Sequence, residues 1–304
     1  MSTEDCRHKE GRCDRMVPLS RHTTAIVASN YVQGHTDAFD RNRLFAGLLI
    51  IGFLNGAVGR VAEGLRRGDL AEMIMNTFEI SAIVWVAVIV AVVFLLRSGK
   101  LAATQADWLV ATAATAGFLI PIAPLSWIAL SGLAVYTLRT SPTGSFARRG
   151  GWILLALTVP MFWSRALFAL FSDLILRFDA ALVGWVLGTE RIGNTIGFSD
   201  GTGYLWIAPG CSSLTNVSLA ILCWVVFTQM FSRERSFHQV WWCLLACTAV
   251  VTINVARLSL IGIYPEHQGI LHGMLGATVA GWVTLVAIVG ICALGVRRDL
   301  STQW

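Results

Sequence analysis

The sequence has few charged residues. Only 13% of its 304 residues are Asp, Glu, Lys or Arg, whereas an average soluble domain has about 25%. In their place, 55% of the residues are hydrophobic and the mean hydropathy is +0.65. A soluble fold needs more charge than this at its surface, so the composition predicts a membrane protein.

The sequence also lacks the signatures of several enzyme classes. It has no glycine-rich phosphate loop, no Gly-x-Ser-x-Gly elbow and no membrane-embedded group of metal ligands, which argues against ATPases, serine hydrolases of that type and metalloproteases. Cys6 and Cys13 lie near His8 and His22, but their spacing matches no zinc pattern, and we interpret this region as a polar tail. No cofactor and no metal ion are expected.

A disulfide framework is missing as well. The cysteines are odd in number and most lie inside apolar runs, which is atypical of disulfide-bonded proteins; they are Cys6, Cys13, Cys211, Cys223, Cys243, Cys247 and Cys292. We expect those within the runs to be small apolar fillers. Cys211 differs in its setting, because it follows a Pro-Gly break at the start of an apolar run.

Long apolar runs dominate the rest of the chain. A membrane helix needs about 20 mainly apolar residues, and eight runs reach or approach this length: residues 44–59, 78–96, 108–122, 124–138, 152–171, 212–231, 240–263 and 272–296. The first, third and fourth are short, so six or seven spans remain alternatives. The expected fold is all-α, a polytopic membrane helical bundle with about eight transmembrane helices embedded in the lipid bilayer.

The basic residues predict the topology. Residues 1–43 are polar and show no pattern of a cleavable signal peptide. Arginine and lysine cluster near those run ends that lie on one side of an eight-span topology, which places both termini in the cytoplasm and the protein in the cell inner membrane. One loop departs from this rule, since Arg60, Arg66 and Arg67 fall outside. The net charge of +5 lies beside apolar runs, so no nucleic-acid partner is expected.

We divide the chain into a polar cytoplasmic tail (residues 1–43), an N-terminal group of transmembrane helices (44–140) and a C-terminal membrane core (141–304). The longest outer segment covers residues 172–210. Its apolar residues, such as Leu174 and Phe178, recur at helical spacing with Asp179 among the polar positions, which predicts an amphipathic helix on the outer interface. Residues 194–198 and 204–208 then flank Ser-Asp-Gly-Thr-Gly, where a hairpin and an ordinary loop both remain open.

Three residues in the last three runs draw attention, because reactive or ionisable side chains inside membrane spans are costly. They are Cys211 in Ala-Pro-Gly-Cys-Ser-Ser-Leu, Arg257 in Asn-Val-Ala-Arg-Leu and His272 in Leu-His-Gly-Met-Leu-Gly. Cys211 and His272 each open a helix at its outer end. Arg257 precedes Ile263 by six residues, so it lies about 9 Å below the outer end of its helix. We therefore expect a shared pocket near the outer face.

Each of these residues suits a step of nucleophilic catalysis. A cysteine at a helix N-terminus faces the positive end of the helix dipole, which favours the thiolate. His272 can transfer a proton near neutral pH, and Arg257 can stabilise a thiolate or an oxyanion or hold a carboxylate. Asn254 lies on the same helical face as Arg257 and can orient it or donate to the same oxyanion. The simpler alternatives are a packing role for Cys211 and a snorkelling side chain for Arg257.

These motifs, in this order, resemble those of the exosortase/archaeosortase family of membrane-embedded cysteine transpeptidase-like enzymes. The family pattern is a Cys-Ser-Gly block, an Asn-x-x-Arg block and a His or Arg that opens the last helix. Here the blocks read Cys211-Ser212-Ser213, Asn254 to Arg257, and His272. The resemblance covers about residues 152–294.

Details around these blocks both support the resemblance and depart from it. Pro160 in the preceding span and Gly193-Asn194 in the outer segment also fit the family. Two departures are that Ser213 replaces the usual glycine and that an uncharged Ala-Pro-Gly precedes Cys211, where an acidic residue is common. The resemblance makes residues 141–304 an exosortase-like catalytic membrane core.

The resemblance implies a cysteine peptidase or transpeptidase that processes C-terminal sorting signals of exported proteins, Pro-Glu-Pro-like in the exosortase branch, with links to polysaccharide export or surface anchoring. Cys211 would be the nucleophile, Arg257 the oxyanion stabiliser and His272 the proton carrier. One alternative is a transporter or channel in which Arg257 and His272 form an ion path, although the sequence shows no internal repeat. The other is a non-catalytic scaffold for polysaccharide assembly, which would tolerate the loss of Cys211.

Overall fold

The computed structural model of the chain describes residues 39–67, 80–120, 122–231 and 238–301. These described residues belong to one compact unit. Most of the predicted N-terminal tail, with Cys6, Cys13 and their neighbouring histidines, lies outside the described residues.

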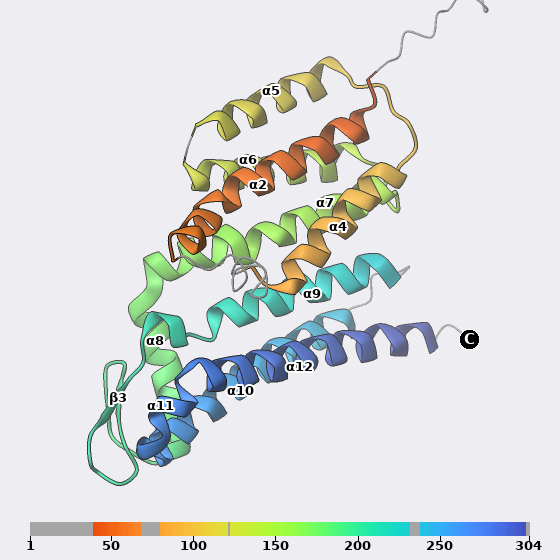
Figure 1. Ribbon diagram of the computed structural model, residues 1–304. Coiled ribbons are helices and arrows are strands. Elements are labelled where there is room, and N and C mark those ends of the chain that lie inside the picture. Colours follow the sequence, from red (N-terminus) through yellow and green to blue (C-terminus); the bar gives the residue numbers. More distant parts are fainter. Residues whose placement is uncertain (1–38, 68–79, 121, 232–237, 302–304) are drawn as a thin grey trace, which may run out of the picture. The chain divides into compact units, whose positions relative to one another are not determined.

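Helices make up most of the described chain (Figure 1). In chain order, its elements are α2 (Arg41–Arg67), α4 (Ala82–Arg97), α5 (Gln105–Leu119), α6 (Ala123–Thr140), α7 (Phe146–Thr158), the π-helical turn η2 (Val159–Trp163), α8 (Ser164–Leu187), β1 (Arg191–Ile192), β2 (Thr195–Gly197), β3 (Tyr204–Trp206), the 3-10 turn η3 (Pro209–Cys211), α9 (Leu214–Phe231), α10 (His238–Ile263), the 3-10 turn η4 (Pro265–His267), α11 (Gln268–Leu271) and α12 (Met274–Ser301).

A helix lies in each of the eight predicted apolar runs, but eight spans are not confirmed. Within the described ranges, five helical segments are long and apolar enough to cross a membrane, and Ala82–Arg97 is a shorter apolar helix; the five are Arg41–Gly59, Phe146–Leu187, Pro209–Phe231, Gln239–Ile263 and Leu275–Arg297. The 15 residues of α5 extend about 22 Å, less than the hydrocarbon core of about 30 Å. Serine and threonine residues lower the hydropathy of α6.

The helices pack around a shared apolar core. α2 packs against α4, α5 and α6, and α7 packs against α4 and α6. α9 contacts α7 as well as α10 and α12, so it joins the N-terminal helices to the C-terminal ones. One cluster of buried side chains runs through all of these helices; it includes Phe45, Leu130, Leu154, Leu222 and Ile288.

A buried ion pair fixes the start of α2 to its neighbours. The Arg41 Nε donates to Asp107 Oδ1 at 2.8 Å, and the hydroxyl of Tyr136 donates to the same oxygen at 3.0 Å. The backbone N–H and the hydroxyl of Thr104 donate to Asp107 Oδ2 at 2.8 and 2.7 Å. Because both carboxylate oxygens are hydrogen-bonded, the desolvation cost of burying Asp107 is offset, and the network ties α2, α5 and α6 together.

The predicted fifth span and the predicted outer amphipathic helix form one continuous helical run, Phe146–Leu187. Pro160 has no N–H to donate, and the chain accommodates it in the π-helical turn η2, after which the N–H of Ser164 donates to the carbonyl of Val159. A second bend occurs at Phe171, where φ is −126° and ψ is 25°. The predicted end of the span at residue 171 is therefore a kink, and the helix continues beyond it.

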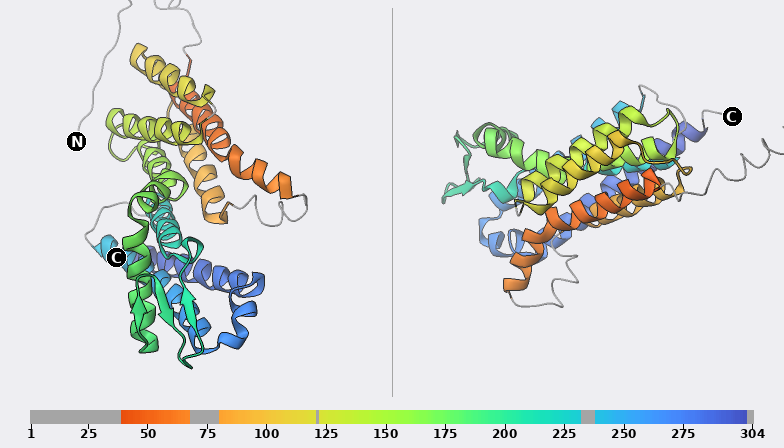
Figure 2. Two further views of the ribbon diagram at one scale, coloured as in Figure 1. Left: turned by 90° about the vertical axis from the view of Figure 1, so that its left-hand side faces the viewer. Right: turned by 90° about the horizontal axis from the view of Figure 1, so that it is seen from above.

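The outer segment contains an antiparallel sheet with the strand order β1-β2-β3. The pairing of Thr195 with Trp206 and of Gly197 with Tyr204 forms the hairpin that the sequence left open as one of two alternatives. The short strand β1, which we did not predict, pairs with β2 through a turn in which Gly193 has a φ of 64°, a conformation that favours glycine. The sheet lies against α8 (Figure 2, left).

A second apolar core lies under this sheet. Ile196 of β2, Leu205 of β3 and Ile207, which follows β3, are buried and pack with residues of α8 and α10, and Cys211 belongs to the same cluster. The turn between β2 and β3 is closed by Thr202, whose backbone N–H and hydroxyl donate to Asp200. These two bonds hold the pKa of the Asp200 carboxyl below its usual value. The sheet is thus packed next to Cys211.

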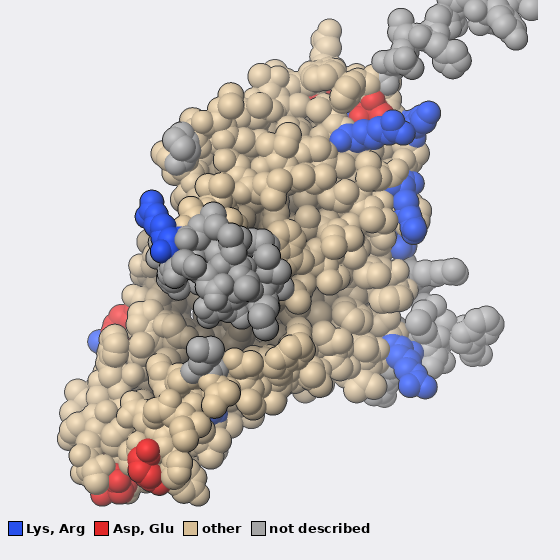
Figure 3. Space-filling view, viewed as in Figure 1, with Lys and Arg blue, Asp and Glu red and all other residues tan. Residues whose placement is uncertain are grey.

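Basic side chains gather at one end of the helices. Figure 3 shows Lys and Arg where α2 begins and where α4 and α12 end. Arg43 lies in the first turn of α2, Arg97 ends α4, and Arg297 lies near the end of α12. Figure 3 also shows a basic side chain on the opposite side, where α2 ends with Arg66 and Arg67, two of the residues that depart from the predicted topology.

Candidate active site

Cys211 is held in a tight turn just before α9. It ends the 3-10 turn η3, and its N–H donates to the carbonyl of Ala208 at 2.9 Å. The helix itself begins at Leu214, where the Ser212 hydroxyl accepts the N–H of Leu214 at 3.3 Å. Cys211 is 7% exposed. We predicted that Cys211 opens the helix, but it lies one short turn before α9. The reason is that Pro209, Ser212 and Ser213 form their own hydrogen-bonded loop.

The structure brings Cys211 and His272 together. The Sγ atom lies 3.4 Å from the Nε2 atom of His272, although the two residues are 61 positions apart in the chain. His272 caps α11 and directly precedes Gly273 and α12, and its N–H donates to the carbonyl of Gln268 at 2.8 Å. Which partner carries the proton depends on the tautomer of the imidazole. This separation allows a proton to pass between thiol and imidazole.

The helix turn that carries His272 depends on glycine at position 276. A Cβ atom on Gly276 would collide with the carbonyl oxygen of Leu271 and would lie 2.8 Å from that of Ile270. Both of these atoms belong to the backbone of α11, which cannot move aside as the end of a flexible side chain can. The glycine therefore allows α12 to start directly against the segment that ends at His272.

Arg257 reaches the same region from α10. Its Nη2 atom lies 3.5 Å from the carbonyl oxygen of Leu271, the residue before His272. Its Nε atom is buried and has no hydrogen-bond partner among the described residues. A buried N–H of a guanidinium without a partner is costly. Arg257 is therefore a donor that an oxyanion or a carboxylate of a ligand can satisfy.

Asn254 holds the loop of Cys211 instead of Arg257. Its Nδ2 atom donates to the carbonyl of Cys211 at 2.8 Å and to the hydroxyl of Ser213 at 3.0 Å. Both N–H groups of the amide are used in this way. Of the roles considered from the sequence, neither orienting Arg257 nor donating to an oxyanion matches this geometry.

Asp179 is a site residue that the sequence did not reveal. It is 2% exposed, and its Oδ2 and Oδ1 atoms accept the N–H and the hydroxyl of Ser213 at 3.1 and 2.8 Å. Hydrogen bonds therefore link Asn254, Ser213 and Asp179 in one continuous network, and each hydrogen bond polarises the next. The only signal in the sequence was spacing: Leu176, Ala180 and Val183 share the buried face of α8 with Asp179.

This network predicts that Asp179→Asn loosens the loop of Cys211. The amide offers one oxygen where two donors of Ser213 require acceptors, so one hydrogen bond to a charged group is lost, at a cost of about 1.5 to 3 kcal/mol. The rate of Cys211 alkylation by iodoacetamide should rise, because Cys211 is 7% exposed and a looser loop uncovers the thiol.

The matched control is Asp173→Asn on the same helix, where Asp173 is exposed and pairs with Arg177 at 3.0 Å. This variant should keep the parental alkylation rate. Equal effects of the two substitutions would contradict the positioning role of Asp179.

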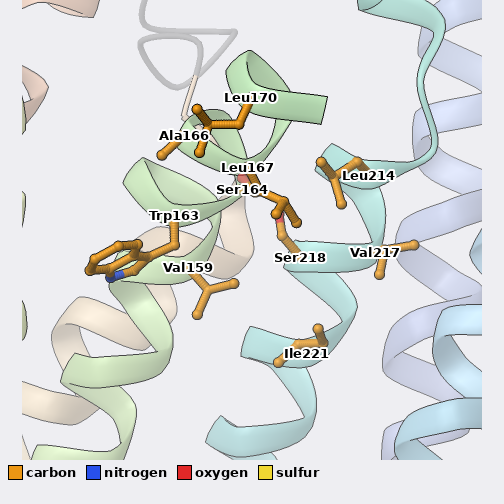
Figure 4. Close-up of a pocket in the computed structure, with 10 residues that line it drawn as sticks. All are labelled: Val159, Trp163, Ser164, Ala166, Leu167, Leu170, Leu214, Val217, Ser218 and Ile221. Atoms are coloured by element: carbon orange, nitrogen blue, oxygen red, sulfur yellow. The ribbon is translucent and has the colours of Figure 1, made fainter. Parts of the chain in front are cut away.

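A cavity lies beside the loop of Cys211, between α8 and α9 (Figure 4). It has a volume of about 440 Å³ and is lined almost entirely by hydrocarbon, including Val159, Leu167 and Val217. The hydroxyl of Ser218, which also lines the cavity, donates to the carbonyl of Thr215 at 2.6 Å. The cavity is therefore an apolar pocket and not a polar ligand site.

Comparisons with known proteins leave the family open. The chain matches no protein-family model, and no curated protein and no solved structure shows significant similarity to it. Among the described residues, no group of three or more His, Cys, Asp and Glu side chains is arranged to hold a metal ion.

Proposed function

We propose that this protein is a membrane-embedded cysteine peptidase or transpeptidase that processes C-terminal sorting signals of exported proteins, as the resemblance to exosortases and archaeosortases implies. The observation that carries the proposal is the distance of 3.4 Å between Cys211 Sγ and His272 Nε2. A thiol that is nearly buried, held in a hydrogen-bonded loop and placed against an imidazole has the parts that nucleophilic catalysis requires.

The reaction begins when His272 accepts the proton of the Cys211 thiol. The sulfur attacks the carbonyl carbon of the scissile peptide bond, and the carbonyl oxygen takes the electron pair as an oxyanion. When the C–N bond breaks, His272 returns the proton to the departing amine and a thioester to Cys211 remains. Water or an acceptor amine then attacks the thioester, which releases the thiol and the product.

Arg257 supplies the charge that this reaction needs. An oxyanion in a site of low dielectric is stabilised most by a donor that is already in place. The Nε atom of Arg257 has no partner among the described residues, and its Nη2 atom lies next to the segment that carries His272. The guanidinium therefore binds the oxyanion without first breaking a strong bond to the protein.

The proposal places the site at the outer face of the cell inner membrane. His272 lies just before the start of α12 and Arg297 near its end, so the site and the basic residues are at opposite ends of this helix. By the positive-inside rule the basic end faces the cytoplasm. In this topology α4, α5 and α6 also lie within the bilayer, which gives eight spans, both termini in the cytoplasm and access for exported proteins.

The test is co-expression with a tagged exported protein that ends in a short motif, an apolar helix and a basic cluster. A shorter product, together with a covalent adduct between enzyme and tagged substrate that hydroxylamine releases, is the expected result, because hydroxylamine cleaves thioesters. A substrate without the short motif serves as the control. If no candidate signal is shortened and no adduct forms, the protein is not a peptidase of this kind.

A further inference from the structure

The strand β3 has one paired edge and one free edge. The N–H of Ile207 donates to the carbonyl of Asn194 at 3.0 Å, and the N–H of Phe198 donates to the carbonyl of Gly203 at 2.9 Å. In an antiparallel pair the direction of the backbone groups alternates from one residue to the next. Since Gly203 and Ile207 face β2, the N–H and C=O groups of Tyr204 and Trp206 face away from it.

These outward groups have no partner within the described part of the chain. β3 is the last strand in the order β1-β2-β3, and its only strand partner there is β2. The side chains of Tyr204 and Trp206 are 69% and 60% exposed, whereas Leu205 is buried below them. β3 is a short strand of three residues, and Tyr204–Trp206 contains neither proline nor lysine, two residues that protect free edges.

The free edge leads directly to the nucleophile. After Trp206 come Ile207, Ala208 and the turn η3, which ends at Cys211. Ile207 and Cys211 belong to the same buried cluster, so this connection is fixed against α8 and α10. A peptide that binds along β3 therefore approaches the region of Cys211 in an extended conformation, which exposes a peptide bond to attack more readily than a helix does.

We propose that the segment of the substrate around the scissile bond binds as an added strand along the free edge of β3. This inference rests on the proposed function. Main-chain hydrogen bonds to Tyr204 and Trp206 supply affinity that does not depend on the substrate sequence. Every second side chain of the substrate lies beside the rings of Tyr204 and Trp206, so an apolar or ring-shaped residue is favoured at alternate positions.

The opposite edge of the sheet is less suited to this role. β1 has only two residues, and the Arg191 side chain donates to the carbonyl of Arg177 at 2.9 Å, which ties this edge to α8. The alternatives to a substrate strand at β3 are a second copy of this chain or the bilayer surface, on which Trp206 would act as an interfacial anchor.

The test is a scan of single N-methyl groups along a synthetic peptide that spans the mapped cleavage position. Each methyl group removes one backbone donor and keeps the side chain. An added strand predicts a pattern with a period of two, with cleavage slowed about 3- to 10-fold or more at alternate positions and little changed between them. A uniform loss, or no loss, would overturn the added strand while leaving the peptidase activity established.

Disulfide trapping tests binding without cleavage. In a Cys211→Ala background, Trp206→Cys should crosslink to a cysteine at one substrate position and Tyr204→Cys to a cysteine two positions away, whereas Leu205→Cys, whose side chain points into the core, should not crosslink. Disulfide-linked dimers without substrate would instead assign the edge to a second copy. Crosslinks at no position would assign it to the bilayer surface, and either outcome overturns the proposal. If the parental protein cleaves no peptide but the crosslinks still form at alternate positions, the peptidase function is refuted. The docking of a strand at the edge of β3 is then retained.

Discussion

Replacing Cys211 with alanine should abolish processing, a loss of about 10³-fold or more in the cleavage rate, because it removes the thiol that forms the acyl intermediate in the proposed reaction. Full-length substrate should accumulate in the membrane. Cys211→Ser should lose nearly as much, since a hydroxyl next to the same imidazole ionises far less readily than a thiol. The measurement is the fraction of tagged substrate shortened over time, compared at equal enzyme levels.

Cys223→Ala provides the matched control. Cys223 is also a buried cysteine without a disulfide, and it lies on α9, the helix that follows Cys211. Its substitution removes one sulfur from the core and should leave the cleavage rate within about threefold of the parental rate, since it touches no reacting group. Continued processing by Cys211→Ala would refute the nucleophile, whereas equal inactivation by Cys223→Ala would indicate a general loss of folding.

Replacing Arg257 should reduce kcat about 10²- to 10³-fold, the range found when a single donor to an oxyanion is removed. Arg257→Gln removes the charge. Arg257→Lys keeps the charge but removes the Nε donor and the planar fork, so it should restore only a small part of the activity. Steady-state kinetics with purified enzyme distinguish the two variants, and KM should change little because the oxyanion exists only after attack.

Arg165→Lys is the control for Arg257. Arg165 is an exposed residue of α8 that lies in the same half of the chain, and its substitution should leave kcat unchanged. An increase in KM for Arg257→Gln with kcat intact would show that the guanidinium holds a carboxylate of the substrate in the ground state instead. That result would contradict the oxyanion role while keeping Arg257 in the site.

The sequence predicted the helices well because apolar length is a local property. The eight runs coincide with helices, and the hairpin at residues 195–206 follows from turn residues that act over short distances. The number of helices that cross the bilayer was harder to predict. Whether α5 and α6 cross the bilayer or lie within one half of it depends on their length and on the helices packed against them. The 15 residues of α5 are short for a span, so their composition alone did not predict a crossing.

The site was only partly predictable. From the predicted topology we expected Cys211, Arg257 and His272 at a similar depth, but the contact between thiol and imidazole depends on how α10 and α12 pack. Asp179 looked like a surface residue, because its partner Ser213 lies 34 positions away. The departure at Ser213 from the family's usual glycine has a physical counterpart here, since its hydroxyl links Asp179 to Asn254.

The separation of 61 residues between Cys211 and His272 has a consequence for biosynthesis. When the ribosome has produced the chain through α9, the thiol has been made, but Asn254, which holds its loop, and the imidazole of His272 have not. Under the proposed function, reactivity of the thiol therefore depends on segments that are made last. A chain that ends after α9 should then be inactive, and the order of synthesis would delay activity until the helices are complete.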